Sequence, residues 1–116
     1  MKEFNIVNLT PHDVIVILEN GIRKVYKSQG IARAKQTDSL LGKINGVPVV
    51  VSEFGEPEGL PDPVNGTMYI VSLATANAAK ACGRATYDLL LTSGPVRDEN
   101  GVIVGCRQFA KLERTW

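Results

Sequence analysis

The sequence has few of the residues on which most catalytic and metal-binding sites depend. Its 116 residues include one histidine, His12, and two cysteines, Cys82 and Cys106. A His-based triad, an HExxH zinc site or a two-histidine metal site is therefore hardly feasible within one chain. The cysteines lack CxxC spacing, so we expect buried free thiols in a reducing compartment rather than a disulfide framework. The glycine patterns of nucleotide-phosphate loops are also missing.

The chain also lacks an excess of charge of either sign and a long apolar run. Its formal net charge is +1, whereas proteins that bind nucleic-acid polymers normally carry a strong basic excess. The longest apolar run, residues 14–18, is far too short to cross a bilayer, and no signal peptide precedes Phe4. We therefore expect a cytoplasmic protein that contacts neither nucleic-acid polymers nor membranes.

The few charges are unevenly distributed. Five basic residues and no acidic one lie between positions 23 and 35, whereas no Lys or Arg lies between 44 and 79, where four acids cluster: Glu53, Glu56, Glu58 and Asp62. Two solvated loops of opposite sign explain this pattern. So do complementary patches on an oligomer, or a basic face for an anionic ligand that would use Arg23, Lys24 and Arg33.

Short β-branched or alternating segments dominate the chain and predict strands. We expect them near residues 4–9, 14–18, 22–27, 31–35, 47–53, 67–72 and 89–91. The run at 14–18 suggests a central strand buried on both faces. Four Asn-Gly dipeptides, beginning at positions 20, 45, 65 and 100, predict turns. The fold class predicted is a β-dominated antiparallel α+β domain that spans residues 1–116.

One helix is expected, over residues 73–82. This segment is rich in alanine, Ser72 or Thr75 can cap its start, and Gly83 suits a left-handed stop. Residues 36–43 are polar and predicted to be irregular. Residues 55–66 contain three prolines and three glycines, so we expect a surface loop, and long rigid loops in small domains are often functional.

The segment 87–109 is predicted to form a hairpin that carries much of the chemistry. An apolar strand breaks at Ser93-Gly94-Pro95, and the chain turns back through a type I′ turn at Asn100-Gly101. This hairpin would present Arg97, Arg107 and Phe109. The first turn of the chain adds Asn8, Thr10 and His12.

These residue types suit a small anionic, nucleotide-like ligand. Arginines bind phosphates, aromatic rings stack on bases, and hydroxyl or backbone groups bind sugars. The candidate ligand-binding residues are Asn8, Thr10, His12, Phe54, Ser93, Gly94, Arg97, Arg107 and Phe109. The arginines could equally form a solvated strand face, and Phe54 and Phe109 could belong to the core. We expect binding rather than catalysis, with no cofactor, metal site or catalytic residue.

Several short segments together resemble one family of small phage proteins. They are residues 8–12 (NLTPH), 46–50 (GVPVV), 54–55 (FG), 59–61 (GLP), 67–72 (TMYIVS), 93–98 (SGPVRD) and 105–107 (GCR). On these motifs the chain resembles the first type of Thoeris anti-defence protein. The resemblance implies a viral protein, acting in the host cytoplasm, that sequesters cyclic ADP-ribose isomers without cleaving them, so that the defence effector is not activated.

The resemblance also implies further partners and roles. It implies a homo-oligomer, a dimer or a hexamer, that also takes up cyclic di- or trinucleotides. From the chemistry of the candidate residues we expect the ligand to lie at a subunit interface, where Arg97 and Arg107 would bind the pyrophosphate and Phe109 or Phe54 would stack on adenine. Two alternatives stay open: a protein-binding inhibitor of a host defence enzyme acting through the acidic loop 53–63, or an enzyme that degrades the signal with Asp or Glu side chains.

Overall fold

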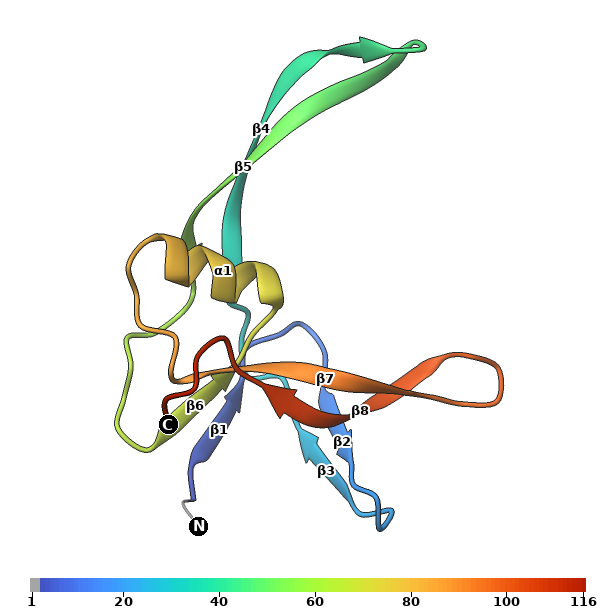
Figure 1. Ribbon diagram of the computed structural model, residues 1–116, viewed down its shortest axis with the longest axis vertical. Helices are drawn as coiled ribbons and strands as arrows, with labels where there is room; N and C mark the ends of the chain where they lie inside the picture. The colour runs from blue at the N-terminus through green and yellow to red at the C-terminus, as the bar shows by residue number, and fades with distance from the viewer. Residues whose placement is uncertain (1–2) are drawn as a thin grey trace.

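The computed structural model describes residues 3–116, which form one six-stranded sheet, one two-stranded sheet and one helix. The six strands lie in the order β1-β6-β7-β8-β2-β3, and β4 and β5 form a separate ribbon (Figure 1). The expected β-dominated α+β class with one short helix is confirmed. The elements are β1 (Asn5–Asn8), β2 (Val14–Ile17), β3 (Arg23–Tyr26), β4 (Arg33–Ile44), β5 (Val47–Glu58), β6 (Thr67–Ile70), α1 (Leu73–Ala81), β7 (Leu89–Arg97) and β8 (Ile103–Ala110).

Antiparallel ladders form the hairpins, and parallel pairs join them. The pairs β2–β3, β4–β5 and β7–β8 are antiparallel, whereas β1–β6, β6–β7 and β2–β8 are parallel. Parallel neighbours need a crossover connection. Between β6 and β7 that connection is α1, which therefore lies across one face of the sheet.

The helix was predicted almost to the residue. It begins after Ser72, whose Oγ accepts a hydrogen bond from the backbone N–H of Thr75 at 3.2 Å, and it ends at Ala81. Gly83 supplies the left-handed stop at φ 86°. Ala76 and Ala79 are fully buried, because small side chains let the helix approach the sheet closely. No helix in residues 3–116 has the length and apolarity needed to span a membrane.

The core has two clusters, one on each side of β6. Tyr69 belongs to the cluster that contains the α1 alanines, and Met68 and Ile70 belong to the other. Successive residues of a strand point to opposite faces, so β6 is the strand buried on both sides. The prediction that residues 14–18 would have this role is wrong. β2 lies next to the edge strand β3, and its side chains alternate between buried and half-buried.

The cysteines are both free, but only one is buried. Cys106 lies inside the second core cluster, as expected. Cys82 is exposed, so the expectation of a buried thiol is wrong there. Cys82 follows directly after α1, and its Sγ donates to the carbonyl oxygen of Ala79 at 3.3 Å.

The Asn-Gly turns differ in type. Asn45 and Gly46 both have positive φ, 52° and 79°, as a type I′ turn requires. The same turn predicted at Asn100-Gly101 is wrong, since only Gly101 has positive φ there. The Asp98 carboxylate accepts hydrogen bonds from the N–H groups of Asn100 and Val102, at 2.8 and 3.0 Å. This side chain holds a wider turn, a type I turn that closes on glycine.

Three predicted boundaries are also wrong. The expected break at residues 93–95 lies inside β7, which Gly94 continues with φ 70°. Residues 36–43 were expected to be irregular but belong to β4, and the expected loop at 55–66 begins only after residue 58. Polar and glycine-rich segments can form strands when a partner strand satisfies their backbone groups.

The β4–β5 ribbon projects from the rest of the molecule as an arm (Figure 1). The radius of gyration is 16.7 Å, against about 13 Å for a compact domain of this length. At the base of the arm, an added Cβ on Gly59 would lie 2.4 Å from the carbonyl oxygen of Ile31. Only glycine allows the two sides of the arm to come so close where they join the body.

A buried ion pair between Arg84 and Asp88 joins two loops of the body. Two guanidinium nitrogens of Arg84 donate to the two carboxylate oxygens of Asp88 at 2.8 and 2.9 Å. Arg84 also donates to the carbonyl oxygens of Ala85 and Pro61. The Asp88 side chain is 1% exposed. The arginine thus connects the loop after β5 with the loop before β7.

We predict that Arg84→Ala lowers the free energy of unfolding by about 3 to 5 kcal/mol, because it leaves a buried carboxylate without a partner. Urea denaturation followed by circular dichroism measures the change. Arg114→Ala is the control, because Arg114 is exposed and should alter stability little. Equal stability of the two variants would contradict this role of the ion pair.

Candidate functional site

The NLTPH segment is held by the side chain of Asn8. Asn8 is fully buried, and its Nδ2 donates to the carbonyl oxygens of His12 and Tyr26 at 2.8 and 2.9 Å. Its Oδ1 accepts from the backbone N–H of Thr10 at 3.0 Å and lies 2.7 Å from Thr10 Oγ1. Asn8 therefore uses its hydrogen-bonding capacity within the fold and joins the ends of β1 and β3.

The exposed side of the same turn carries a second set of bonds. Ser28 N–H donates to Asp13 Oδ1 at 3.0 Å, and Lys27 Nζ donates to Asp13 Oδ2 at 3.0 Å. The Ser28 N–H, and after it Lys27, holds the pKa of the Asp13 carboxyl below its usual value of 3.8. The exposed His12 side chain lies next to this anion in the sequence, so the turn is a poor place for a phosphate.

The long β7–β8 ribbon separates the two arginines that were expected to share a pyrophosphate. Arg97 pairs with Ile103 in the ladder, four positions from Arg107, which corresponds to roughly 13 Å along a strand. The ladder is also irregular between Val96 and Arg97, where its register shifts. Arg97 donates to the carbonyl oxygen of Gly101, and Arg107 to that of Ile17. Within one chain the two guanidinium groups do not converge.

The other candidates on the ribbon are held by neighbouring side chains. Phe109 is half-buried and packs against Tyr26, with ring centroids 5.6 Å apart. Ser93 Oγ accepts a hydrogen bond from Gln108 Nε2 at 3.1 Å. A Cβ on Gly94 would lie 3.1 Å from Arg107 Cβ. Phe109 therefore packs at the edge of the second core cluster. The missing side chain of Gly94 makes room for Arg107.

A shallow groove of about 520 Å³ brings the first turn beside the ribbon. His12 and Asp13 line one side, and Thr92, Ile103 and Cys106 line the other. Neither Arg97 nor Arg107 lines this groove, and its one carboxylate disfavours an anion. We do not place the ligand here.

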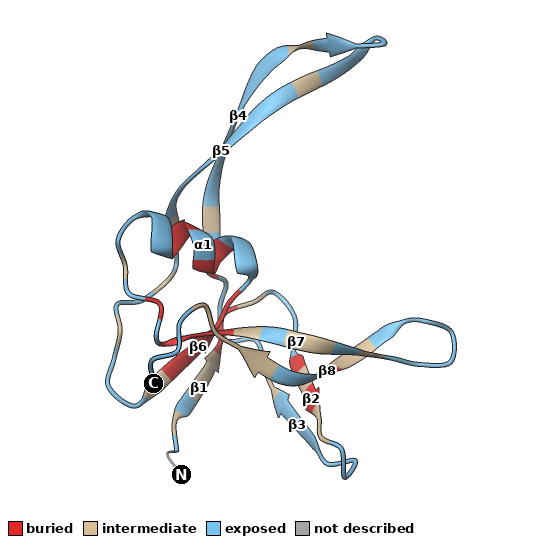
Figure 2. Cartoon of the chain, viewed as in Figure 1, coloured by how far each residue is buried: buried red, intermediate tan, exposed pale blue. Residues whose placement is uncertain are grey.

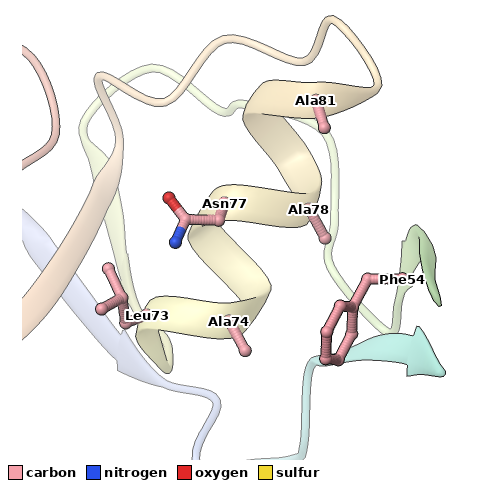
Figure 3. Close-up of a pocket in the computed structure, with 6 residues that line it drawn as sticks. All are labelled: Phe54, Leu73, Ala74, Asn77, Ala78 and Ala81. Atoms are coloured by element: carbon pink, nitrogen blue, oxygen red, sulfur yellow. The ribbon is translucent and has the colours of Figure 1, made fainter. Parts of the chain in front are cut away.

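A second groove, of about 460 Å³, runs along α1 and is lined by Phe54 of the arm. Figure 3 shows the Phe54 ring on the side of α1 that carries Ala74, Ala78 and Ala81. The ring is not core: Phe54 is 58% exposed. The small side chains of α1 leave open space beside this exposed ring, and an exposed aromatic ring is a surface on which a base can stack.

A third hollow, of about 340 Å³, lies at the start of α1; it shares no lining residue with the Phe54 groove, and the helix start links the two. Thr10, Arg33 and Ser72 line it together with Pro11, Ile31 and Ala32, and the next residue, Leu73, lines the Phe54 groove. The N–H groups and the dipole at a helix start favour an anion. Because the first turn of α1 contains no acidic residue, no side chain of that turn takes this place. We call the two hollows together the arm-base cleft.

Arg33 is the cation of this cleft. It lies opposite Glu58 in the β4–β5 ladder, but the ion pairs found among residues 3–116 join Lys27 to Asp13 and Arg84 to Asp88. The exposed guanidinium of Arg33 is thus available to a ligand. Arg23 and Lys24 lie on β3, at the edge of the other sheet, so the three basic residues predicted as a second site belong to two separate sheets.

Thr10, Arg33 and Phe54 all line the arm-base cleft. The sequence had suggested Thr10 and Phe54 as ligand-binding residues and Arg33 as part of a second, basic site. Sequence reasoning missed the contribution of α1 at Ser72, Ala74 and Ala78. In the sequence, the only sign that α1 contributes to a site is that the predicted helix begins with a capping residue and has no acidic residue in its first turn. Comparison with protein-family models, curated proteins and solved structures finds no match for this chain.

We predict that Asn8→Ala lowers the free energy of unfolding by about 2 to 3 kcal/mol, because buried carbonyl and N–H groups lose their partners. Asn5→Ala is the matched control, since Asn5 is an exposed asparagine on the same strand. Chemical denaturation of both variants measures the difference. A small effect at Asn8, equal to that at Asn5, would show that the turn does not depend on this amide.

We predict that the Asp13 carboxyl titrates below pH 3.8 in the folded protein. A lowered pKa means that the carboxylate stabilises the fold above that pH, and that this contribution is lost as the pH falls through the folded-state pKa. NMR titration of the Asp13 carboxyl carbon measures the midpoint. Lys27→Ala should raise it only in part, because the Ser28 N–H is the larger cause. A full return to 3.8 in that variant would contradict this order of causes.

Proposed function

We propose that this chain is a phage anti-defence protein that sequesters a cyclic ADP-ribose-type signal in the host cytoplasm. It binds the ligand in the arm-base cleft and holds it without cleavage, so the defence effector stays inactive. The observation that carries the proposal is the exposed Phe54 ring opposite the α1 alanines, beside a hollow that contains Arg33 and the helix start. The resemblance of the segments 46–50, 67–72, 93–98 and 105–107 to a family of phage anti-defence proteins supports the same function.

The anionic part of the ligand lies at the start of α1. Backbone N–H groups at a helix N-terminus bind phosphate oxygens, and the Arg33 guanidinium adds charge-assisted hydrogen bonds on the other side of the hollow. A pyrophosphate needs both, because it carries two charges. Ser72 contributes less, since its Oγ already accepts from Thr75 N–H and lies 2.8 Å from Thr75 Oγ1.

The adenine lies in the Phe54 groove. Stacking of a base on an aromatic side chain contributes about 1 to 3 kcal/mol, and the alanines of α1 exclude water from the opposite face of the base. Asn77 also lines the groove, and its amide can both donate to and accept from ribose hydroxyls. Arg97 and Arg107, held apart on the β7–β8 ribbon, are not ligands in this proposal.

The first test is a release assay on the purified chain. The protein is incubated with cyclic ADP-ribose isomers and cyclic trinucleotides, freed of unbound ligand and heat-denatured, and mass spectrometry identifies what is released. We expect intact cyclic ADP-ribose isomer. An altered ligand would mean an enzyme that degrades the signal. Retention of no ligand would overturn the proposal in favour of an inhibitor that binds a host protein.

We predict that Phe54→Ala and Arg33→Ala each weaken binding of the retained isomer by about tenfold or more, which corresponds to about 1.4 kcal/mol. Isothermal titration calorimetry measures the dissociation constants. Arg97→Ala and Arg107→Ala are the controls and should bind as the unmodified chain does. The opposite pattern, loss in the Arg97 and Arg107 variants alone, would move the site to the β7–β8 ribbon.

A further inference from the structure

The strand β3 lies at one end of the six-stranded sheet and leaves one side of its backbone free. It pairs with β2 on the other side, and after β3 the chain meets β1 at a bridge between Asn8 and Ser28. Figure 2 shows β3 exposed along most of its length, in contrast to the neighbouring strand β2. A free strand edge offers N–H and carbonyl groups to another strand. The sheet can therefore be extended at β3.

The register of the β2–β3 hairpin shows which backbone groups are free. Near the turn, the N–H of Leu18 donates to the carbonyl oxygen of Ile22. Hydrogen-bonded and non-hydrogen-bonded pairs alternate along an antiparallel ladder, so the even-numbered residues of β3 bond to β2. Arg23 and Val25 direct their N–H and carbonyl groups away from it. An added strand therefore finds two donors and two acceptors along this edge.

The free edge of β3 is basic. No acidic residue lies between positions 20 and 37. Arg23 and Lys24 are exposed, and the ion pairs found among residues 3–116 join other side chains. Arg107 donates to the carbonyl oxygen of Ile17 at 3.2 Å, and Ile17 lies opposite Arg23 in the ladder, so a third cation lies at the same level of the sheet. Positive charge at this edge favours an acidic strand.

Exposed aliphatic side chains alternate with the cations of β3. Val25 is 51% exposed and Ile22 is 54% exposed. Successive residues of a strand point to opposite faces, so Arg23 shares one face with Val25, and Lys24 shares the other with Ile22. Each face thus presents one cation and one aliphatic side chain. An added strand can cover the aliphatic side chains while its acids meet the cations.

We propose that β3 binds an extended acidic segment of a partner protein, which joins the sheet as a further, antiparallel strand. In such complexes main-chain hydrogen bonds provide affinity and side chains provide specificity. Antiparallel pairing is the more stable kind and places residues directly opposite each other. Read from its N-terminus, the segment carries an aliphatic residue, two acids and a second aliphatic residue. They lie opposite Val25, Lys24, Arg23 and Ile22.

The charges and backbone groups of the edge favour this occupant over two others. Like charges directly opposite each other destabilise a strand pair, so the β3 edges of two copies repel. The acids Glu53, Glu56 and Glu58 of this chain lie on β5, which is already paired with β4. A nucleic acid would meet the cations, but its phosphates carry no donor for the free carbonyl groups. A peptide backbone supplies both donors and acceptors.

Isothermal titration calorimetry with a synthetic peptide, Thr-Val-Glu-Glu-Val-Thr, tests the charge pattern. We expect saturable binding to the purified chain, and at least tenfold weaker binding of the peptide in which lysines replace both glutamates. The double variant with Arg23→Glu and Lys24→Glu should reverse this preference. Failure of the acidic peptide to bind, or equal binding of the two peptides, would overturn the proposal.

Val25→Pro tests the main-chain pairing. Proline removes an N–H that points away from β2 and is tolerated on a free edge, so the hairpin is retained while the added strand loses a hydrogen bond. We expect at least tenfold weaker peptide binding, whereas Val25→Thr, which is similar in shape, should bind as the unmodified chain does. Circular dichroism checks that each variant is folded. Unchanged binding in Val25→Pro would mean that charge alone attracts the peptide, and would overturn the proposal.

Hydrogen exchange measured by NMR separates a peptide strand from a nucleic acid. The peptide should slow exchange at the amides of Arg23 and Val25, and a single-stranded oligonucleotide of equal charge should not displace it. Displacement at equal concentration, or amides left unprotected, would contradict strand addition. None of these residues lines the arm-base cleft, so the outcome is independent of whether the chain binds a signal molecule.

Discussion

The buried amide of Asn8 is the interaction on which the rest of the structure depends. It holds the ends of β1 and β3 and the turn between β1 and β2 at one point. From that point the backbone N–H of Leu9 donates to Ile70 of β6, and the N–H of Ala32 donates to Leu9 just before the arm begins. The backbone of Leu9, next to this buried amide, therefore ties the residue that precedes β4 to the end of β6. The NLTPH motif is accounted for by this structural duty, although it was first considered as part of a binding site.

The position of the helix follows from the other constraint, the parallel pairing of β6 with β7. A crossover of this kind must pass over the sheet, and alanines at the contact let it pass closely. Thr75 Oγ1 then donates to the carbonyl oxygen of Ala32 at 3.2 Å, which fixes the start of α1 to the base of the arm. The arm-base cleft is the space that remains where these two elements meet. Neither element would form it alone.

Local sequence patterns predicted where helices and turns form better than they predicted what packs against them. The helix cap, the stop at Gly83 and the turn at Asn45-Gly46 each depend on a few adjacent residues. The stop and the turn were predicted correctly, and Ser72 is one of the two caps that the sequence allowed. The turn at Asn100-Gly101 was assigned the wrong type because a carboxylate two residues earlier binds its backbone. The outer half of β4 reads as irregular because no buried face imposes an alternating pattern on it. The cleft could not be predicted, since Arg33, Phe54 and Ser72 come together only through the crossover helix and the arm.

The two ends of the arm differ in charge. At the base, Arg33 lies opposite Glu58, so the basic and acidic segments of the sequence meet there within one chain. Beyond Asp38, whose carboxylate accepts hydrogen bonds from Gln36 and Ser52, the side chains become aliphatic. The base of the arm therefore carries the charged and polar side chains that lie next to α1, and the tip carries exposed aliphatic side chains, so the two ends of this hairpin present different surfaces.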